Sequence, residues 1–214
     1  FEISADLLRE DELELISDMR PGLIQLEIGV QSTNGDTIRE IHRTMRLEEV
    51  YRAVNRVKAG KNIHQHLDLI AGLPFEDYQR FQQSFNDIYA LHLQQLQLGF
   101  LKVLKGSYMY EHAQEYGLVY RSRPPYEVMA SKWVSYDEML EIRLVEEMLE
   151  LHYNSGQFLT YLAVLEWKYD STFQMFLDMG HFYREHGYLD CSHSRVRRTE
   201  IVQEFAEIVD PERR

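Results

Sequence analysis

The fold is decided by two segments, Leu26-Glu27-Ile28-Gly29-Val30-Gln31-Ser32 and His66-Leu67-Asp68-Leu69-Ile70-Ala71-Gly72-Leu73-Pro74. Each has the length and composition of a β-strand and runs directly into a turn and a helix-like pattern. In each, apolar and polar side chains alternate, so one face of the strand is apolar and the other is polar. Parallel strands that are buried on both faces are normally apolar throughout. The alternation therefore predicts a sheet with helices on one side and a hydrated, functional cavity on the other.

Strand and helix patterns alternate over the first 105 or so residues. We predict strands at residues 1–4, 23–31, 63–71 and 94–104. We predict helices between them, one carrying Leu7, Leu8, Leu13 and Ile16 and the others at residues 36–44, 47–60 and 78–89. This order indicates parallel strands joined by right-handed crossovers. We therefore expect an α/β fold, half of a parallel (β/α) barrel over residues 1–110, whose unpaired outer strands invite association with another chain.

The pattern changes near residue 120. Residues 121–126 contain two prolines and predict an extended linker. A capping box, Ser135 with Glu138, opens a predicted helix, and further helices follow near residues 157–168, 171–186 and 195–208. Residues 120–214 are thus expected to form an all-α C-terminal domain of unknown function.

Composition narrows the classes of function. The chain has 214 residues and a formal net charge of −12, which argues against nucleic-acid partners and anionic membranes. No apolar run is long enough to span a bilayer. Cys191 is the only cysteine, so neither an intrachain disulfide nor a cysteine-based metal cluster can form within the chain. These features predict a soluble, cytoplasmic protein.

The polar strand faces supply the candidate site residues. We expect a pocket for a polar substrate lined by Glu27, His64, His66, Gln95, Gln97 and Lys102. Parallel sheets place their sites at the carboxyl ends of the strands, where Gln31 and Asp68 lie. The alternative is an ordinary sheet with one solvated face.

The sequence resembles the radical S-adenosylmethionine (SAM) enzymes over residues 1–105. Glu27-Ile28-Gly29-Val30-Gln31-Ser32 with Ile41-His42-Arg43 looks like the fourth barrel strand and following helix of the coproporphyrinogen-oxidase-like and cobalamin-associated members. Asp68-Leu69-Ile70-Ala71-Gly72-Leu73-Pro74-Phe75-Glu76-Asp77 looks like their fifth strand and turn. The later residues resemble an uncharacterised domain attached to some cobalamin-binding members.

The resemblance implies roles for four residues. Glu2 would hold the ammonium group of SAM and Arg43 its carboxylate, while Gln31 and Asp68 would bind the ribose hydroxyls. The family also binds a [4Fe–4S] cluster through a CxxxCxxC loop, and cobalamin serves some members. One cysteine cannot supply that loop. The resemblance therefore implies the C-terminal part of a radical SAM enzyme that lacks its N-terminal half and is inactive alone, with an unknown substrate.

Two other classes of function fit parts of the sequence. His64, His66 and Asp68 could ligate a metal on one strand face, as in metal-dependent hydrolases with barrel folds. The aromatic C-terminal helices could instead grip a partner protein, which would make the chain a non-catalytic interaction module. The same aromatic residues are equally typical of helix–helix core packing.

Overall fold

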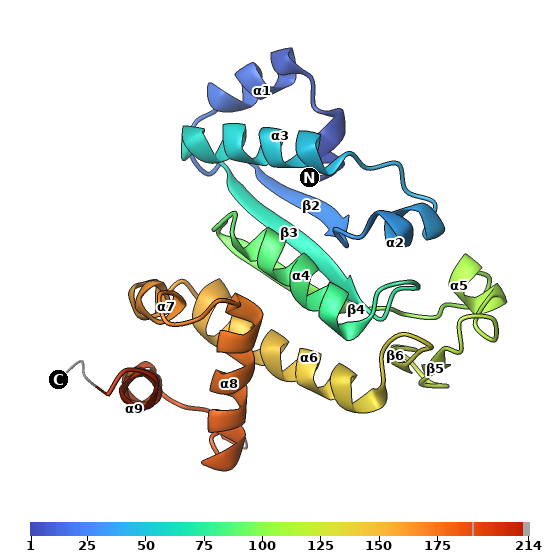
Figure 1. The fold of residues 1–214 in the computed structure, drawn as a ribbon. Coiled ribbons are helices and arrows are strands. Elements are labelled where there is room, and N and C mark those ends of the chain that lie inside the picture. The colour runs from blue at the N-terminus through green and yellow to red at the C-terminus, as the bar shows by residue number, and fades with distance from the viewer. Residues whose placement is uncertain (190, 212–214) are drawn as a thin grey trace. The chain divides into compact units, whose positions relative to one another are not determined.

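The computed structural model describes residues 1–189 and 191–211. The chain divides into two compact units, Phe1–Leu140 and Glu141–Arg214 (Figure 1). The boundary expected from the sequence, between residues 110 and 120, falls inside the first unit. The reason is that the residues after 110 pack against the end of the sheet rather than starting the helical unit.

The first unit is built on a parallel sheet, which confirms the predicted α/β class. Its strands are β1 (Glu2–Ile3), β2 (Gln25–Gln31), β3 (His64–Ala71) and β4 (Gln95–Phe100). They lie in the order β1-β2-β3-β4, and every neighbouring pair is parallel. β1 and β4 are shorter than predicted. Beyond Phe100 the chain leaves β3 and pairs in the opposite direction, with a bridge between Lys102 and Glu127.

Helices follow each of the first three strands. The structure contains η1 (Ala5–Leu7), α1 (Glu10–Ser17), α2 (Gly35–Glu40), α3 (Leu47–Gly60) and α4 (Tyr78–Tyr89). The single helix predicted across Leu7 and Ile16 is wrong, because Leu8 and Arg9 are extended and divide it. Ser4 makes no capping hydrogen bond with its side chain. Asp77 does cap α4, where its side chain accepts a hydrogen bond from the backbone N–H of Arg80.

The core of this unit lies on the apolar face of the sheet. Leu26, Ile28 and Val30 of β2 are buried, as are Leu67 and Leu69 of β3. The helices contribute the buried side chains Val50, Val54 and Val57 of α3 and Phe81, Phe85 and Ile88 of α4. Each such side chain contributes roughly 1.5–3 kcal/mol through burial. The opposite face of the sheet keeps its polar side chains half-buried or exposed, apart from His66.

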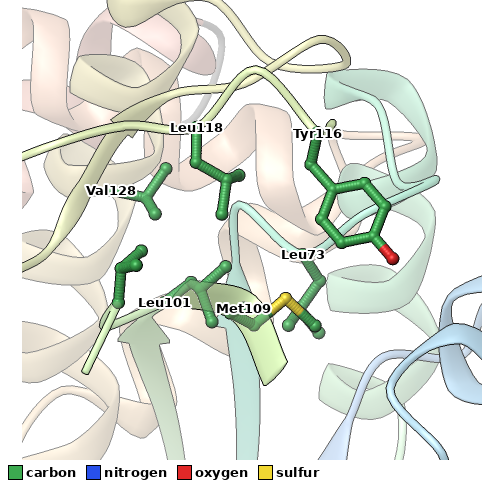
Figure 2. Close-up of a cluster of buried hydrophobic side chains, with 7 residues drawn as sticks. Leu73, Leu101, Met109, Tyr116, Leu118 and Val128 are labelled. Carbon is green, nitrogen blue, oxygen red and sulfur yellow. The ribbon is translucent and has the colours of Figure 1, made fainter. Parts of the chain in front are cut away.

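The segment after β4 closes one end of the sheet. It contains α5 (Tyr108–Glu111) and an antiparallel hairpin of β5 (Val119–Tyr120) and β6 (Val128–Ala130). Residues 121–126 are the loop of this hairpin, so their prediction as a linker is wrong. The segment buries a cluster of seven side chains, Leu73, Leu101, Val103, Met109, Tyr116, Leu118 and Val128 (Figure 2). Tyr116, Leu118 and Val128 thereby pack the segment against Leu73 in the turn after β3.

The second unit is helical, whereas the all-α domain predicted over residues 120–214 also included the β6 strand of the first unit. Its elements are the greater part of α6 (Tyr136–Met148), a π-helical turn η2 (Leu149–Asn154), α7 (Leu159–Glu166), α8 (Thr172–Glu185) and α9 (Arg195–Val209). The capping box at the start of α6 is present: Ser135 N–H donates to Glu138 Oε2 at 2.7 Å, and Glu138 N–H donates to Ser135 Oγ at 3.3 Å.

Most aromatic side chains of this unit form its core. Phe158, Phe173, Phe176 and Tyr183 are buried, whereas Trp167 is 89% exposed. None of the helices in the described part of the chain is both long and apolar enough to cross a bilayer.

Candidate functional site

A pocket of about 360 Å³ lies on the polar face of the sheet. It brings together Glu2 of β1, Glu27 and Gln31 of β2, Asp68 of β3 and Arg43 from beyond α2. The parallel register explains the gathering, because Glu2 pairs with Glu27 and Gly29 pairs with Asp68. All four residues to which the resemblance assigns SAM contacts line this one pocket, although up to 66 positions separate them in the sequence.

Gln31 reaches the pocket through an irregular backbone. The register of β2 against β3 shifts between Gly29 and Gln31, and Gln31 has a positive φ of 70°. Such a bulge re-aims a side chain at the end of a strand. The Gln31 amide consequently lies over Gly29, where a Cβ atom would be 2.4 Å from its Nε2 and 3.4 Å from Nη1 of Arg43. The missing side chain of Gly29 thus makes room for both groups.

Arg43 stands just beyond the end of α2. The helix ends at Glu40, so the prediction of a helix to residue 44 is too long. His42 adopts a φ of 57°, and the backbone N–H of Arg43 donates to the carbonyl of Ile38 at 3.0 Å. This left-handed turn closes the helix and directs the chain toward the pocket.

Glu27, His66 and Asp68 form a tight polar group under the pocket. One ligand atom of each lies within 4.8 Å of the others, and His66 Nε2 is 3.0 Å from Asp68 Oδ1. Burial raises the pKa of Asp68, the neighbouring Glu27 and Glu2 raise it further, and His66 opposes the shift.

Several buried polar atoms of this region lack a hydrogen-bond partner within the described chain. They are Gln31 Oε1, Asp68 Oδ1 and His66 Nε2. His66 Nε2 and Asp68 Oδ1 lie 3.0 Å apart and face each other. Buried polar groups are normally paired, so these atoms are available to a ligand.

The turns after β2 and β3 are tied together beside the pocket. Ser32 Oγ donates to Glu76 Oε1 at 2.6 Å, and Ser84 Oγ donates to the same oxygen at 2.7 Å. Asn34 Nδ2 also donates to the carbonyl of Phe75 at 2.7 Å, and Thr37 Oγ1 donates to that of Pro74 at 2.9 Å. Burial raises the pKa of Glu76, and the two serine hydroxyls work against that shift. These bonds hold the strand ends that carry Gln31 and Asp68.

A second pocket of about 380 Å³ continues along the strand ends and shares Gln31 and Asp68 with the first. It adds Gln97 and the exposed Lys102, together with the apolar side chains of Phe100 and Leu101. Two of the predicted substrate-pocket residues, Gln97 and Lys102, therefore lie beside the first pocket rather than in it.

The remaining candidates lie elsewhere on the polar face. His64 is exposed at the start of β3, four residues before Asp68, and Gln95 starts β4 opposite His66. Four residues of strand span about 13 Å, so His64 cannot join the metal-ligand group predicted with His66 and Asp68. Glu27 of the neighbouring strand takes that place.

Sequence reasoning missed two features of the site. One is the bulge at Gln31, which no periodicity reveals. The other is the buried pair of Ser32 and Glu76, because serine and glutamate residues in turns are usually expected to be exposed to solvent.

Two comparisons of sequence bear on the chain. Residues 114–213, which are less than half of it, match a family described as a protein of unknown function (DUF4080). No curated protein sequence matches the chain.

Solved structures are similar over part of the chain. Coproporphyrinogen III oxidase (HemN) of Escherichia coli, a radical SAM enzyme, matches 46% of this chain and 22% of its own at 23% identity, with a TM-score of 0.41. The radical SAM methyltransferase TsrM of Kitasatospora setae, solved with tryptophan and a SAM analogue, matches 46% and 19% at 12% identity, with a TM-score of 0.40.

An N-terminally truncated Elp3 of Methanocaldococcus infernus matches 63% of this chain and 33% of its own at 17% identity, with a TM-score of 0.46. This chain thus spans a third or less of each of these structures.

Proposed function

We propose that the chain is part of a radical SAM enzyme and that the pocket of Glu2, Gln31, Arg43 and Asp68 binds SAM. The observation that carries the proposal is the meeting of these four residues in one pocket of about 360 Å³. This volume lies within the roughly 300–1,000 Å³ that is usual for small-molecule sites. Glu2 pairs with the ammonium group, Arg43 with the carboxylate, and Gln31 and Asp68 with the ribose.

The charge of the pocket supports this ligand. Glu2, Glu27 and Asp68 are acidic, and Arg43 is the basic side chain among the residues that line the pocket. SAM carries a sulfonium and an ammonium group against one carboxylate, so it is a cation with one anionic end. An acidic pocket with one guanidinium complements that distribution.

The unpaired atoms support the same placement. Gln31 Oε1 is an acceptor without a hydrogen-bond partner in the described chain, and Asp68 Oδ1 has none besides its contact with His66 Nε2 at 3.0 Å. A ribose diol brings two O–H donors, which would satisfy both oxygens. The gain is large for buried groups, because an unmade hydrogen bond there costs about 1–3 kcal/mol.

The iron–sulfur cluster does not fit this chain. Its ligands are thiolates, and Cys191, the single cysteine, is exposed in the second unit. The proposal therefore assigns SAM binding to this chain and the cluster to the parent enzyme, where such a cluster would supply the electron for cleavage of SAM. Cobalamin as a further cofactor stays a prediction, and the substrate is unknown. By itself the chain is expected to be inactive.

A dissection of the ligand tests the assigned contacts. Titrations monitored by NMR would compare methionine with 5′-methylthioadenosine, which represent the two ends of SAM. Arg43→Gln should weaken methionine and leave methylthioadenosine unchanged, whereas Asp68→Asn should do the reverse. Arg39→Gln is the matched control, because Arg39 is exposed and does not line the pocket. The proposal would be contradicted if Arg43→Gln and Asp68→Asn changed the affinities for both ligands equally, or if the unaltered chain bound neither ligand.

A second candidate function rests on Glu27, His66 and Asp68. One imidazole and two carboxylates suit zinc or manganese, and His66 Nε2 is buried without a hydrogen-bond partner in the described chain. A metal-dependent reaction at this group predicts stoichiometric zinc binding that His66→Ala abolishes and His64→Ala preserves. Absence of zinc binding, or equal loss in both variants, removes this candidate.

A further inference from the structure

The helical unit contains a pocket of its own, which is independent of the proposed SAM site. Its volume is about 310 Å³, and it lies among the end of α6, the π-helical turn η2, α8 and the segment that leads into α9. The side chains that matter chemically are Glu147, Tyr183, Tyr188, Cys191, His193 and Arg198. All of them fall within the region that matches the family of unknown function.

Unpaired polar atoms lie in and behind the wall of this pocket. Tyr183 lines the pocket and is only 1% exposed, yet its hydroxyl has no hydrogen-bond partner among the described residues. His152 of η2 packs edge-on against the Tyr183 ring at 5.4 Å, and neither of its ring nitrogens has a partner there. π-Helical turns are frequent at functional sites, which makes this location informative.

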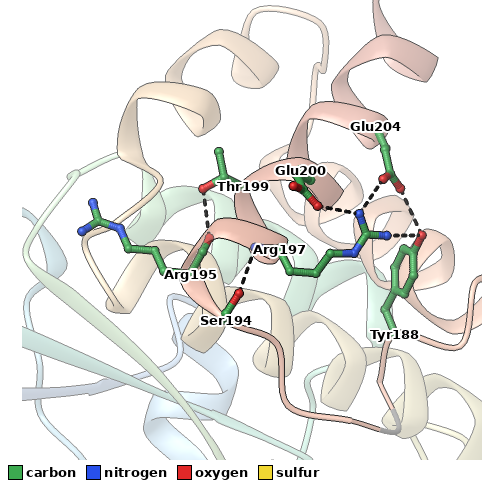
Figure 3. Close-up of polar contacts among 7 residues, drawn as sticks. All are labelled: Tyr188, Ser194, Arg195, Arg197, Thr199, Glu200 and Glu204. Atoms are coloured by element: carbon green, nitrogen blue, oxygen red, sulfur yellow. Dashed lines mark hydrogen bonds and ion pairs between the residues drawn. The ribbon is translucent and has the colours of Figure 1, made fainter.

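The two neighbouring arginines of α9, Arg197 and Arg198, differ in how many hydrogen bonds their guanidinium groups make. Arg197 is fully engaged: its guanidinium contacts Glu200 and Glu204 at 2.9 Å and the Tyr188 hydroxyl at 3.1 Å (Figure 3). This network anchors the segment before α9 to the helix. Arg198 lines the pocket, and among the described residues its guanidinium makes one hydrogen bond, from Nε to the carbonyl of His193 at 3.2 Å. Its terminal nitrogens are therefore donors that a ligand in the pocket could engage.

We propose that this pocket binds the oxyanion of a small metabolite, a carboxylate or a phosphate. Arg198 supplies the charge, and the Tyr183 hydroxyl supplies a buried donor. Arg198 lies in the first turn of the 15-residue helix α9, whose positive end adds to the charge on this side of the pocket. Arg–oxyanion pairs of this kind are strong because both partners gain charge-assisted hydrogen bonds.

Two titratable side chains near the pocket, His152 and Glu147, affect the charge that a bound anion would meet. Burial, with Arg198 nearby, lowers the pKa of His152 to about 3, so the imidazole is neutral and does not add charge. Glu147 is the acidic side chain of the wall, and desolvation raises the pKa of its carboxyl. An anion in the pocket is repelled by the ionised form of Glu147. Glu147→Gln should therefore strengthen anion binding.

Calorimetric titration of the 214-residue chain with inorganic phosphate and with benzoate tests the proposal. At least one probe should bind saturably, and the stronger one identifies the preferred oxyanion. Arg198→Gln should weaken it by at least about tenfold, and Tyr183→Phe by about fivefold. Tyr183→Phe should not lower the melting temperature, because it removes an unsatisfied hydroxyl. Arg195→Gln is the control on the same helix and should leave the affinity unchanged, since Arg195 does not line the pocket.

The single cysteine gives a second readout. Cys191 is exposed and lines the pocket, with its Sγ 3.7 Å from His193 Nε2. The bound anion should slow alkylation of Cys191 by iodoacetamide, and Arg198→Gln should abolish this protection. The proposal is overturned if neither probe binds at millimolar concentration, or if Arg195→Gln weakens binding as much as Arg198→Gln does.

Discussion

The hydroxyl of Ser32 donates a 2.6 Å hydrogen bond to the buried carboxyl of Glu76, across 44 positions of sequence. Ser32 follows β2 directly, and Glu76 lies in the turn after β3. Neither residue lines the pocket, but their bond joins the strand ends that present Gln31 and Asp68. The geometry of the candidate site therefore depends on residues that would not touch a ligand.

The buried carboxyl of Glu76 makes stability depend on pH. Its pKa is raised from the ordinary 4.5 by burial, so the folded chain keeps a proton that the unfolded chain releases near pH 4.5. The stabilising contribution is complete below that pH and is lost as pH rises to the raised pKa of the folded state. Denaturant unfolding should show this decline relative to Glu76→Gln, which carries no titrating carboxyl. A difference between the two proteins that stays constant from pH 4.5 into the neutral range would contradict this expectation.

Gly29 provides space for two pocket side chains. In Gly29→Ala the new Cβ would meet Gln31 Nε2 at 2.4 Å, and the flexible amide must then move. We expect weaker SAM binding by about tenfold with little loss of stability, since the displaced atom is the end of a side chain. Gly35→Ala, whose Cβ would meet only Arg39 at 3.7 Å, is the control. Unchanged SAM affinity in Gly29→Ala would show that Gln31 does not contact the ligand.

Gln31 holds a backbone conformation that suits glycine. Its φ of 70° costs about 1 kcal/mol or more in a residue with a side chain. Gln31→Gly should therefore preserve or raise the free energy of unfolding while it lowers SAM affinity. Thermal unfolding and titration of the same preparation check both halves. A variant that is destabilised without loss of affinity would mean that the amide serves folding instead of binding.

Gly180 permits close packing within the helical unit. A Cβ at this position of α8 would lie 2.3 Å from Cγ of Leu144. Gly180→Ala should lower the free energy of unfolding by about 1–3 kcal/mol through overpacking. Adding Leu144→Ala should recover part of the loss, because the truncated side chain leaves room for the methyl group. Strictly additive losses in the double variant would argue against this contact.

Much of the sheet could be predicted from its alternating side chains. The strands β2 and β3 and the polar face carrying Glu27, His66 and Asp68 follow from a period of two. The split between η1 and α1 could not be predicted, because the apolar residues from Leu7 to Ile16 suggest one helix. In the structure Leu8 and Arg9 are extended and interrupt it. The hairpin loop at residues 121–126 was hidden in the same way, since two prolines indicate extended chain without revealing its pairing.

The candidate site was predictable to a similar degree. Glu2, Gln31 and Asp68 could be assigned to one face from alternation, and Arg43 entered through the resemblance. Long-range packing decided the rest. The bulge that turns Gln31 and the replacement of His64 by Glu27 beside His66 depend on register between strands, which local sequence does not encode.

The most direct test of the SAM site is the affinity of the 214-residue chain for SAM, measured by isothermal titration calorimetry. The predicted result is saturable binding that Arg43→Gln and Asp68→Asn each weaken by at least about tenfold, as expected for the loss of a charge-assisted hydrogen bond. Arg39→Gln should retain the affinity of the unaltered chain. Absence of binding at millimolar SAM, or affinities of Arg43→Gln and Asp68→Asn equal to that of Arg39→Gln, would contradict the assignment of this pocket to SAM.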